Sequence, residues 1–175
     1  MRREPGHSVL VVPVPELEPF VVERTRHYDA SFLSADPSFV HAHVTLLAPW
    51  LAAPSPDDLD RVAKLAAATP AFDFVLAELK TFAGGTIYLD PAPASPFASL
   101  TAELVAAFPQ CPPYGGLFAA VPHLTVDHLL GGVTVAETRS ALGAHLPAVC
   151  RADRISLQWY ANDDCRTLAE WELGR

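Results

Sequence analysis

The sequence predicts an α+β protein built from two related halves. The chain has 175 residues, and 50% of them are hydrophobic, which is enough to pack one domain or two lobes around a shared core. Segments typical of strands alternate with segments typical of helices, and two strands follow one another directly in only two places. Two similar tetrapeptides, near residues 43 and 123, each lie on a predicted strand that is followed by a predicted helix.

Seven segments have the composition of β-strands, because β-branched and other apolar residues dominate them. The first is closed by Pro15, and the second ends in a segment that contains Pro49 and Pro54. Gly84 and Gly85 form the turn between the third and fourth strands. In chain order, the predicted strands cover residues 7–14, 39–50, 72–79, 86–89, 121–130, 151–160 and 165–173.

Four segments predict helices. The stretch SPDD at 55–58 is a strong helix start, with a hydroxyl at the N-cap, proline at the first helical position and acidic residues at the positive end of the dipole. That helix stops before Pro70, and another opens at Ser95-Pro96. The remaining two helices are expected over 18–28 and 134–146, and the stretch CPPYGG at 111–116 is expected to be a loop.

Charge and cysteine content narrow the possible partners and compartment. The net charge is −8, so the chain lacks the broad basic surface that extended nucleic-acid binding requires. No apolar stretch approaches the roughly 20 residues that span a bilayer, and the first residues predict no signal peptide. The three cysteines are far apart, without a C-x-x-C pair, which fits a reducing compartment. We therefore expect a cytoplasmic protein without a membrane partner.

The two similar tetrapeptides are HVTL at 43–46 and HLTV at 123–126. Residues i and i+2 of a strand point to the same face, so His43 lies beside Thr45 and His123 beside Thr125. The intervening residues are apolar and point the other way. An imidazole beside a hydroxyl, with an apolar face behind them, indicates a polar cleft backed by a core. The alternative is two unrelated histidines on two strands.

The stretches HAHVTLLAPW at 41–50 and VPHLTVDHLL at 121–130 resemble the two signature motifs of the two-histidine (2H) phosphoesterases. This family includes 2′,5′-RNA ligase-like proteins and cyclic nucleotide phosphodiesterases. The 80-residue separation of His43 and His123 also suits it. The resemblance implies a single bilobal domain over residues 1–175, with pseudo-symmetric halves of antiparallel sheet, helices packed outside and a central cleft. It also implies that no metal or cofactor is needed.

The predicted chemistry is the opening of a 2′,3′-cyclic phosphate, which needs a base to activate water and an acid to protonate the departing ribose oxygen. His43 and His123 can do both, because imidazole titrates near neutral pH. The resemblance implies His43 as the acid and His123 as the base, and the reverse reaction exchanges these roles. Thr45 and Thr125 would bind the phosphate oxygens. We expect a monomeric, metal-independent phosphodiesterase for a 2′,3′-cyclic phosphate, or a related 2′,5′ linkage, on a nucleotide or short RNA end.

Three other interpretations are open at this stage. The cleft could bind nucleotide phosphates without turnover. RNA 2′,5′-ligation is a second alternative, although Asp127 and His128 follow the second motif where some RNA-joining members carry a basic residue. A metal site of His41, His43 and His123 with Asp127 is a third, but it would leave both threonines without a role.

Several neighbouring residues have two interpretations each. Tyr114 and Phe118, just before the second motif, either stack on a nucleobase or fill the space between the loop and the core. Asp127 is expected on the face of His123 and Thr125, where it would either orient an imidazole or repel phosphate. His128 is expected to be a hydrogen-bonded core histidine, and Phe82 and Tyr88 are expected in the core.

Overall fold

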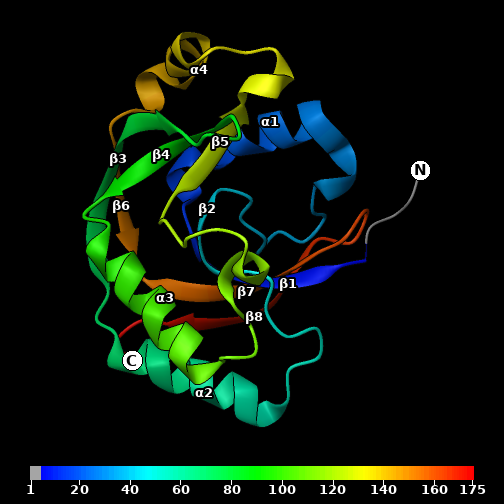
Figure 1. Cartoon of the computed structure of the whole chain (residues 1–175), viewed down its shortest axis with the longest axis vertical. Coiled ribbons are helices and arrows are strands. Elements are labelled where there is room, and N and C mark those ends of the chain that lie inside the picture. Colours follow the sequence, from blue (N-terminus) through cyan, green and yellow to red (C-terminus); the bar gives the residue numbers. More distant parts are fainter. Residues whose placement is uncertain (1–4) are drawn as a thin grey trace.

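Two four-stranded antiparallel sheets form the centre of the molecule (Figure 1). The computed structural model describes residues 5–175. In the first sheet the strands are, from edge to edge, β2 (His43–Leu47), β1 (His7–Pro13), β7 (Arg154–Tyr160) and β8 (Arg166–Glu172). In the second sheet they are β5 (Leu124–His128), β4 (Thr86–Ala92), β3 (Phe72–Thr81) and β6 (Ala148–Ala152). The predicted α+β class with antiparallel sheets is confirmed.

Four α-helices lie around the outside of the two sheets (Figure 1). They are α1 (Glu18–Asp29), α2 (Pro56–Ala68), α3 (Ser95–Ala107) and α4 (Val135–Leu142). The order β1-α1-β2-α2 is repeated as β4-α3-β5-α4, so the predicted internal repeat is present. The first helix of each unit contacts the other sheet: α1 packs on β5, and α3 packs on β2. None of the helices in residues 5–175 is long and apolar enough to cross a membrane.

One hydrophobic core connects the two sheets. It takes Leu10 and Val12 from β1, Val44 and Leu46 from β2, and Phe97 from α3, all at most 2% exposed. Burial of each such side chain stabilises the fold by about 1.5–3 kcal/mol relative to its exposure. Because the core residues of β2 alternate with His43 and Thr45, this packing also fixes the direction in which the two polar side chains point.

The structure divides the predicted strand 151–160 into two. The chain runs through β6 in the second sheet, passes Asp153 and enters the first sheet as β7. The predicted strands do not include β6 as a separate element, because its first residues follow Pro147 directly and the predicted helix extends to residue 146. That helix, α4, ends at Leu142 because Gly143 takes a positive φ of 37°.

The two strands that carry the motifs are shorter than predicted. The segments 39–50 and 121–130 contain only β2 and β5, so His43 is the first residue of its strand and His123 immediately precedes its strand. Pro49 and Pro122 lie just outside the strands, where a missing backbone N–H is tolerated. The predicted loop 111–116 contains a short 3₁₀ turn, Pro113–Gly116. Both histidines therefore lie where a loop enters an edge strand.

Candidate functional site

The edge strands β2 and β5 contact one another, and this contact brings the two predicted motifs into one region. His43, Thr45 and His123 are half-buried, and Thr125 is exposed. The intervening residues of both motifs are buried in the core: Val44, Leu46, Leu124 and Val126. Each half therefore contributes one imidazole and one hydroxyl that stay accessible above an apolar layer.

Both histidines are anchored in the same way. His43 Nδ1 lies 2.7 Å from the carbonyl oxygen of His41, and His123 Nδ1 lies 2.6 Å from the carbonyl oxygen of Val121. A carbonyl can only accept, so each Nδ1 carries a hydrogen and donates it. In the neutral ring the proton-accepting nitrogen is then Nε2. Both halves thus fix the tautomer through a carbonyl two residues earlier.

The pKa of His43 lies below its usual value of 6.5. Burial is the largest cause, and the charge of His123 lowers the pKa further. The bond to the His41 carbonyl and the charge of Glu18 act in the opposite direction. At neutral pH the His43 ring is therefore uncharged and able to accept a proton. His123 acts on His43 because the contact between β2 and β5 brings the two motifs together.

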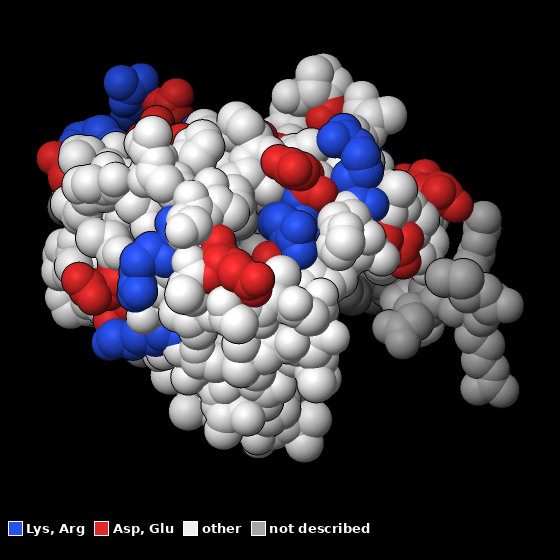
Figure 2. Space-filling model, turned by 90° about the horizontal axis from the view of Figure 1, so that it is seen from above, with Lys and Arg blue, Asp and Glu red and all other residues white. Residues whose placement is uncertain are grey.

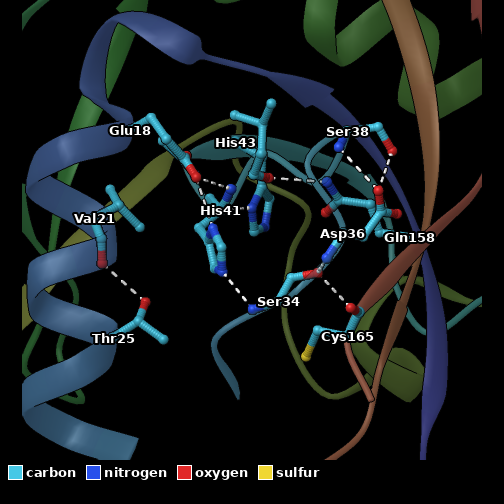
Figure 3. A network of polar contacts seen from close by, with 12 residues as sticks. Glu18, Val21, Thr25, Ser34, Asp36, Ser38, His41, His43, Gln158 and Cys165 are labelled. Carbon is cyan, nitrogen blue, oxygen red and sulfur yellow. Dashed lines mark hydrogen bonds and ion pairs between the residues drawn. The ribbon is translucent and has the colours of Figure 1, made fainter. Parts of the chain in front are cut away.

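On the side of Nδ1, His43 is surrounded by polar groups that the sequence analysis did not identify. Figure 3 shows Glu18 on α1 reaching His41, with His43 beside them. The hydroxyl of Tyr160 lies 3.4 Å from His43 Nδ1 and donates to Gln158 Oε1 at 3.1 Å. The sequence does contain a sign of Gln158, because it is a polar residue within the apolar strand β7. Nothing in the sequence connects Glu18 with His43.

His123 has an aromatic environment instead. Phe82 and Tyr88 stack with ring centroids 4.0 Å apart, and both meet His123 edge-on, at 5.0 and 5.6 Å. Tyr88 is buried, as expected of a core residue, but Phe82 is only half-buried. Both rings therefore line the site next to the second motif, where aromatic edges and faces hold the imidazole.

The structure places Tyr114 and Phe118 on one loop at different depths. Tyr114 is half-buried, lines a small pocket together with Thr45 and Val121, and donates its backbone N–H to the Ala48 carbonyl at 2.7 Å. Phe118 is 72% exposed, with its ring centroid 6.4 Å from that of Tyr114. Tyr114 thus packs against the first motif, whereas Phe118 does not fill the space below the loop.

Asp127 does not do what the strand alternation predicted. The β4–β5 register shifts so that Tyr88 faces Thr125 and Ile87 faces Asp127, which interrupts the alternation between these two positions. Asp127 is 6% exposed and binds α1, through an ion pair of 2.8 Å with Arg24 and a hydrogen bond from Tyr28. It therefore neither orients an imidazole nor faces a phosphate.

Two other histidines have structural partners. His41 Nδ1 donates to Glu18 at 2.6 Å, and its Nε2 accepts the Ser34 N–H at 3.1 Å, so neither nitrogen is free to ligate a metal. His128 Nδ1 accepts the Leu130 N–H at 3.1 Å and caps a 3₁₀ turn. Within residues 5–175 no group of three or more His, Cys, Asp or Glu side chains is arranged to hold a metal ion.

The charged side chains form no continuous basic area on the face that Figure 2 shows. Lys and Arg lie there singly or beside Asp and Glu. Among the described residues of the whole molecule, Lys80 forms an ion pair with Asp90, and Arg151 forms one with Asp73. A large nucleic acid would therefore find no extended attractive surface on this face.

Comparison with known proteins gives both a family and a fold. The model of the 2′-5′ RNA ligase superfamily matches residues 13–164, whereas no curated protein sequence matches the chain. Escherichia coli LigT complexed with NADP+ has a similar structure, with 18% identity and a TM-score of 0.59 over 98% of this chain and 99% of that one. LigT complexed with 3′-AMP has 18% identity and a TM-score of 0.58, over 98% of this chain and 100% of that one. A protein of Thermus thermophilus has 15% identity and a TM-score of 0.56, over 96% of this chain and 98% of that one.

Proposed function

Because the chain belongs to the 2′-5′ RNA ligase superfamily, we propose that it is a metal-independent phosphodiesterase that opens a 2′,3′-cyclic phosphate, or hydrolyses a related 2′,5′ linkage. The observation that carries this proposal is the pair of equivalent motifs on β2 and β5. Each supplies an imidazole whose Nδ1 donates to a backbone carbonyl and a hydroxyl two residues later. The two imidazoles provide the proton donor and acceptor of general acid–base catalysis at phosphorus, and the two hydroxyls provide hydrogen-bond donors for the phosphate.

In the proposed reaction, His43 Nε2 takes a proton from water as the water oxygen bonds to phosphorus. His123, protonated on Nε2, gives that proton to the ribose oxygen as its bond to phosphorus breaks. The product is a phosphate monoester, and proton exchange with solvent restores both rings. The lowered pKa of His43 supports its role as base, which is the reverse of the roles that the family resemblance implies.

Thr45 and Thr125 are proposed to donate their hydroxyl hydrogens to the non-bridging phosphate oxygens. Charge builds up on these oxygens in the transition state, and donors that are already in place stabilise it without reorganisation. Tyr114 is half-buried beside Thr45, and exposed Phe118 lies on the same loop. We assign these two rings to the contact with a nucleobase.

The proposed substrate is a small nucleotide or a short RNA end. The net charge of −8 and the scattered basic side chains on the face in Figure 2 disfavour a long nucleic acid. LigT has been crystallised with 3′-AMP, a nucleoside monophosphate of the kind that the proposed hydrolysis would release. We further propose that the protein acts as a monomer in the cytoplasm, where its three free, buried cysteines stay reduced.

The test is the hydrolysis of the four 2′,3′-cyclic mononucleotides in EDTA by the wild type, His43→Ala and His123→Ala. Each variant should lose ~10²–10⁴ in rate, the usual contribution of one positioned proton donor or acceptor. His145→Ala, at an exposed histidine, is the control and should keep full activity. The position of the phosphate on the product identifies the bond that breaks.

Other outcomes select the alternatives. Full activity in either motif variant would remove that histidine from the proposed mechanism. Tight nucleotide binding without turnover by the wild type, across cyclic and 2′,5′-linked substrates, would select the binding module. Joining of RNA ends in place of hydrolysis would select the ligase.

A further inference from the structure

The Glu18 carboxylate fixes the peptide segment immediately before the first motif. Its Oε1 accepts the His41 backbone N–H at 2.9 Å and His41 Nδ1–H at 2.6 Å, and its Oε2 accepts the Ala42 N–H at 2.8 Å. The Ala42 carbonyl in turn accepts the Val14 N–H at 2.8 Å. Glu18 of α1 therefore holds both peptide units that flank His41, and Val14, directly after β1, holds the next unit, which links Ala42 to His43.

The same segment carries the group that orients His43. The carbonyl that receives His43 Nδ1–H belongs to His41, whose side chain is also bound at both nitrogens, by Glu18 and Ser34 (Figure 3). The side chain of His41 is 9% exposed and that of Glu18 is 26% exposed. A change at Glu18 would therefore move the carbonyl that fixes the imidazole, although Glu18 itself does not contact His43.

The second motif lacks an equivalent carboxylate among the contacts of the described residues. The carbonyl that anchors His123 belongs to Val121, which is 42% exposed and is held by a backbone bond to the Ala119 carbonyl at 3.1 Å. Between Asp90 and Asp127 the only charged residue is Glu103. Both histidines donate to a backbone carbonyl two residues earlier. The segment that carries the first carbonyl is held by a carboxylate, whereas the segment that carries the second is held by a backbone hydrogen bond.

We infer that Glu18 and His41 form a positioning pair that holds the His43 imidazole in its reactive orientation. The inference rests on the proposed function, in which His43 takes a proton from water. A misplacement of about 1 Å in a reacting group can cost ~10²-fold in rate, so the pair has a large effect on turnover without touching the substrate. His123, on a loop with no charged support, is held instead by the Val121 carbonyl and by the rings of Phe82 and Tyr88.

Electrostatics adds a second, measurable effect. Burial acts to raise the pKa of Glu18, but the hydrogen bonds from His41 and Ala42 outweigh this effect. The pKa of Glu18 therefore lies below its usual value of 4.5, and the carboxylate is ionised at neutral pH. The charged or titratable groups that act on His43 are Glu18 on α1, His41 before β2 and His123 before β5, and Tyr160 on β7 faces it as a neutral phenol. Of these, only Glu18 is an anion, and it raises the pKa of His43.

The test replaces Glu18 by glutamine, which keeps the shape and removes the charge. Glu18→Gln should lower kcat ~10–100-fold with KM within ~2-fold of wild type. It should also lower the pKa of His43, followed by NMR titration of the ring. Glu23→Gln, at an exposed glutamate of the same helix, is the matched control and should change neither quantity. His41→Gln should reduce kcat less, because both backbone bonds to Glu18 remain.

The outcomes separate this inference from the proposed function. Wild-type kcat together with an unchanged His43 pKa in Glu18→Gln would overturn the positioning role. If no cyclic phosphate is turned over by the wild type, the proposed function fails, but the NMR titration still tests whether Glu18 controls His43. If Glu18→Gln does not fold, His41→Gln with wild-type kcat and His43 pKa overturns the inference.

Discussion

At the scale of single residues, the two threonines have the most specific role in the proposed chemistry. Thr45 is half-buried and Thr125 exposed, and neither hydroxyl has a hydrogen bond within the described part of the chain. Thr45→Val and Thr125→Val keep the shape and remove the donor. Each should lower kcat ~10²–10³-fold, the usual effect of losing one oxyanion donor.

The control for the threonine variants is Thr81→Val, at an exposed position at the end of β3. It should keep wild-type rates, and circular dichroism should show that all three variants are folded. Wild-type kcat in both Thr45→Val and Thr125→Val would mean that the hydroxyls do not stabilise the transition state.

The sequence allowed the four motif residues to be placed on one accessible surface but not the groups behind them. The i, i+2 rule and the apolar neighbours were enough for His43, Thr45 and Thr125. The carbonyl anchors depend on loop geometry at the strand ends, which no periodicity encodes. Glu18 is distant in sequence, and its contact with His41 follows only from the packing of α1.

At the scale of the elements, α1 links the two sheets, because it connects β1 and β2 of the first sheet and packs on β5 of the second. Asp127 accepts hydrogen bonds from Arg24 and Tyr28, and its side chain is 4% exposed. Asp127→Ala leaves the guanidinium of Arg24, whose side chain is 22% exposed, without its carboxylate partner. The free energy of unfolding should fall by about 1–3 kcal/mol, because hydrogen bonds to charged groups are lost and their partners stay desolvated.

Asp73→Ala provides the matched control for the loss of the Asp127 carboxylate. Asp73 pairs with Arg151, but these side chains are 73% and 58% exposed, so its removal should change stability by at most about 1 kcal/mol. Urea denaturation of both variants measures the difference. Equal losses would show that the contact between α1 and β5 contributes no more than a surface pair.

Elements with local signals were predicted well, and elements defined by tertiary pairing were not. The helix start predicted at Ser55 is confirmed: Ser55 is the N-cap, and Asp58 N–H donates to Ser55 Oγ at 3.2 Å as part of a capping box. In contrast, β6 exists because it pairs with β3, and its sequence carries no strand alternation strong enough to separate it from β7. The prediction for Asp127 was wrong because the register shift opposite Ile87 interrupts the alternation.

At the scale of the whole molecule, stability should fall as the pH is lowered from neutral. The pKa of His43 is depressed, so below about 6.5 the unfolded chain takes up a proton that the folded protein resists. The pKa of Glu18 is also depressed, so its contribution is present above 4.5 and is lost as the pH falls through its folded value. Both groups act in the same direction.

Urea denaturation at pH 7.5, 5.5 and 4 should therefore give free energies of unfolding that decrease in this order. In His43→Ala the first decrease should be smaller than in the wild type. A free energy of unfolding that rises between pH 7.5 and 5.5 would contradict the depressed pKa of His43.

The central claim is that two motifs from two sheets act on one phosphate, and ligand titration tests it most directly. The histidine rings would be followed by NMR while 3′-AMP, a nucleoside monophosphate of the kind that the proposed hydrolysis releases, is added. We predict that the signals of His43 and His123 move together with one dissociation constant and a 1:1 stoichiometry, while exposed His27 and His145 stay unchanged. A response of only one motif histidine, or two different dissociation constants, would contradict a single site built from both halves.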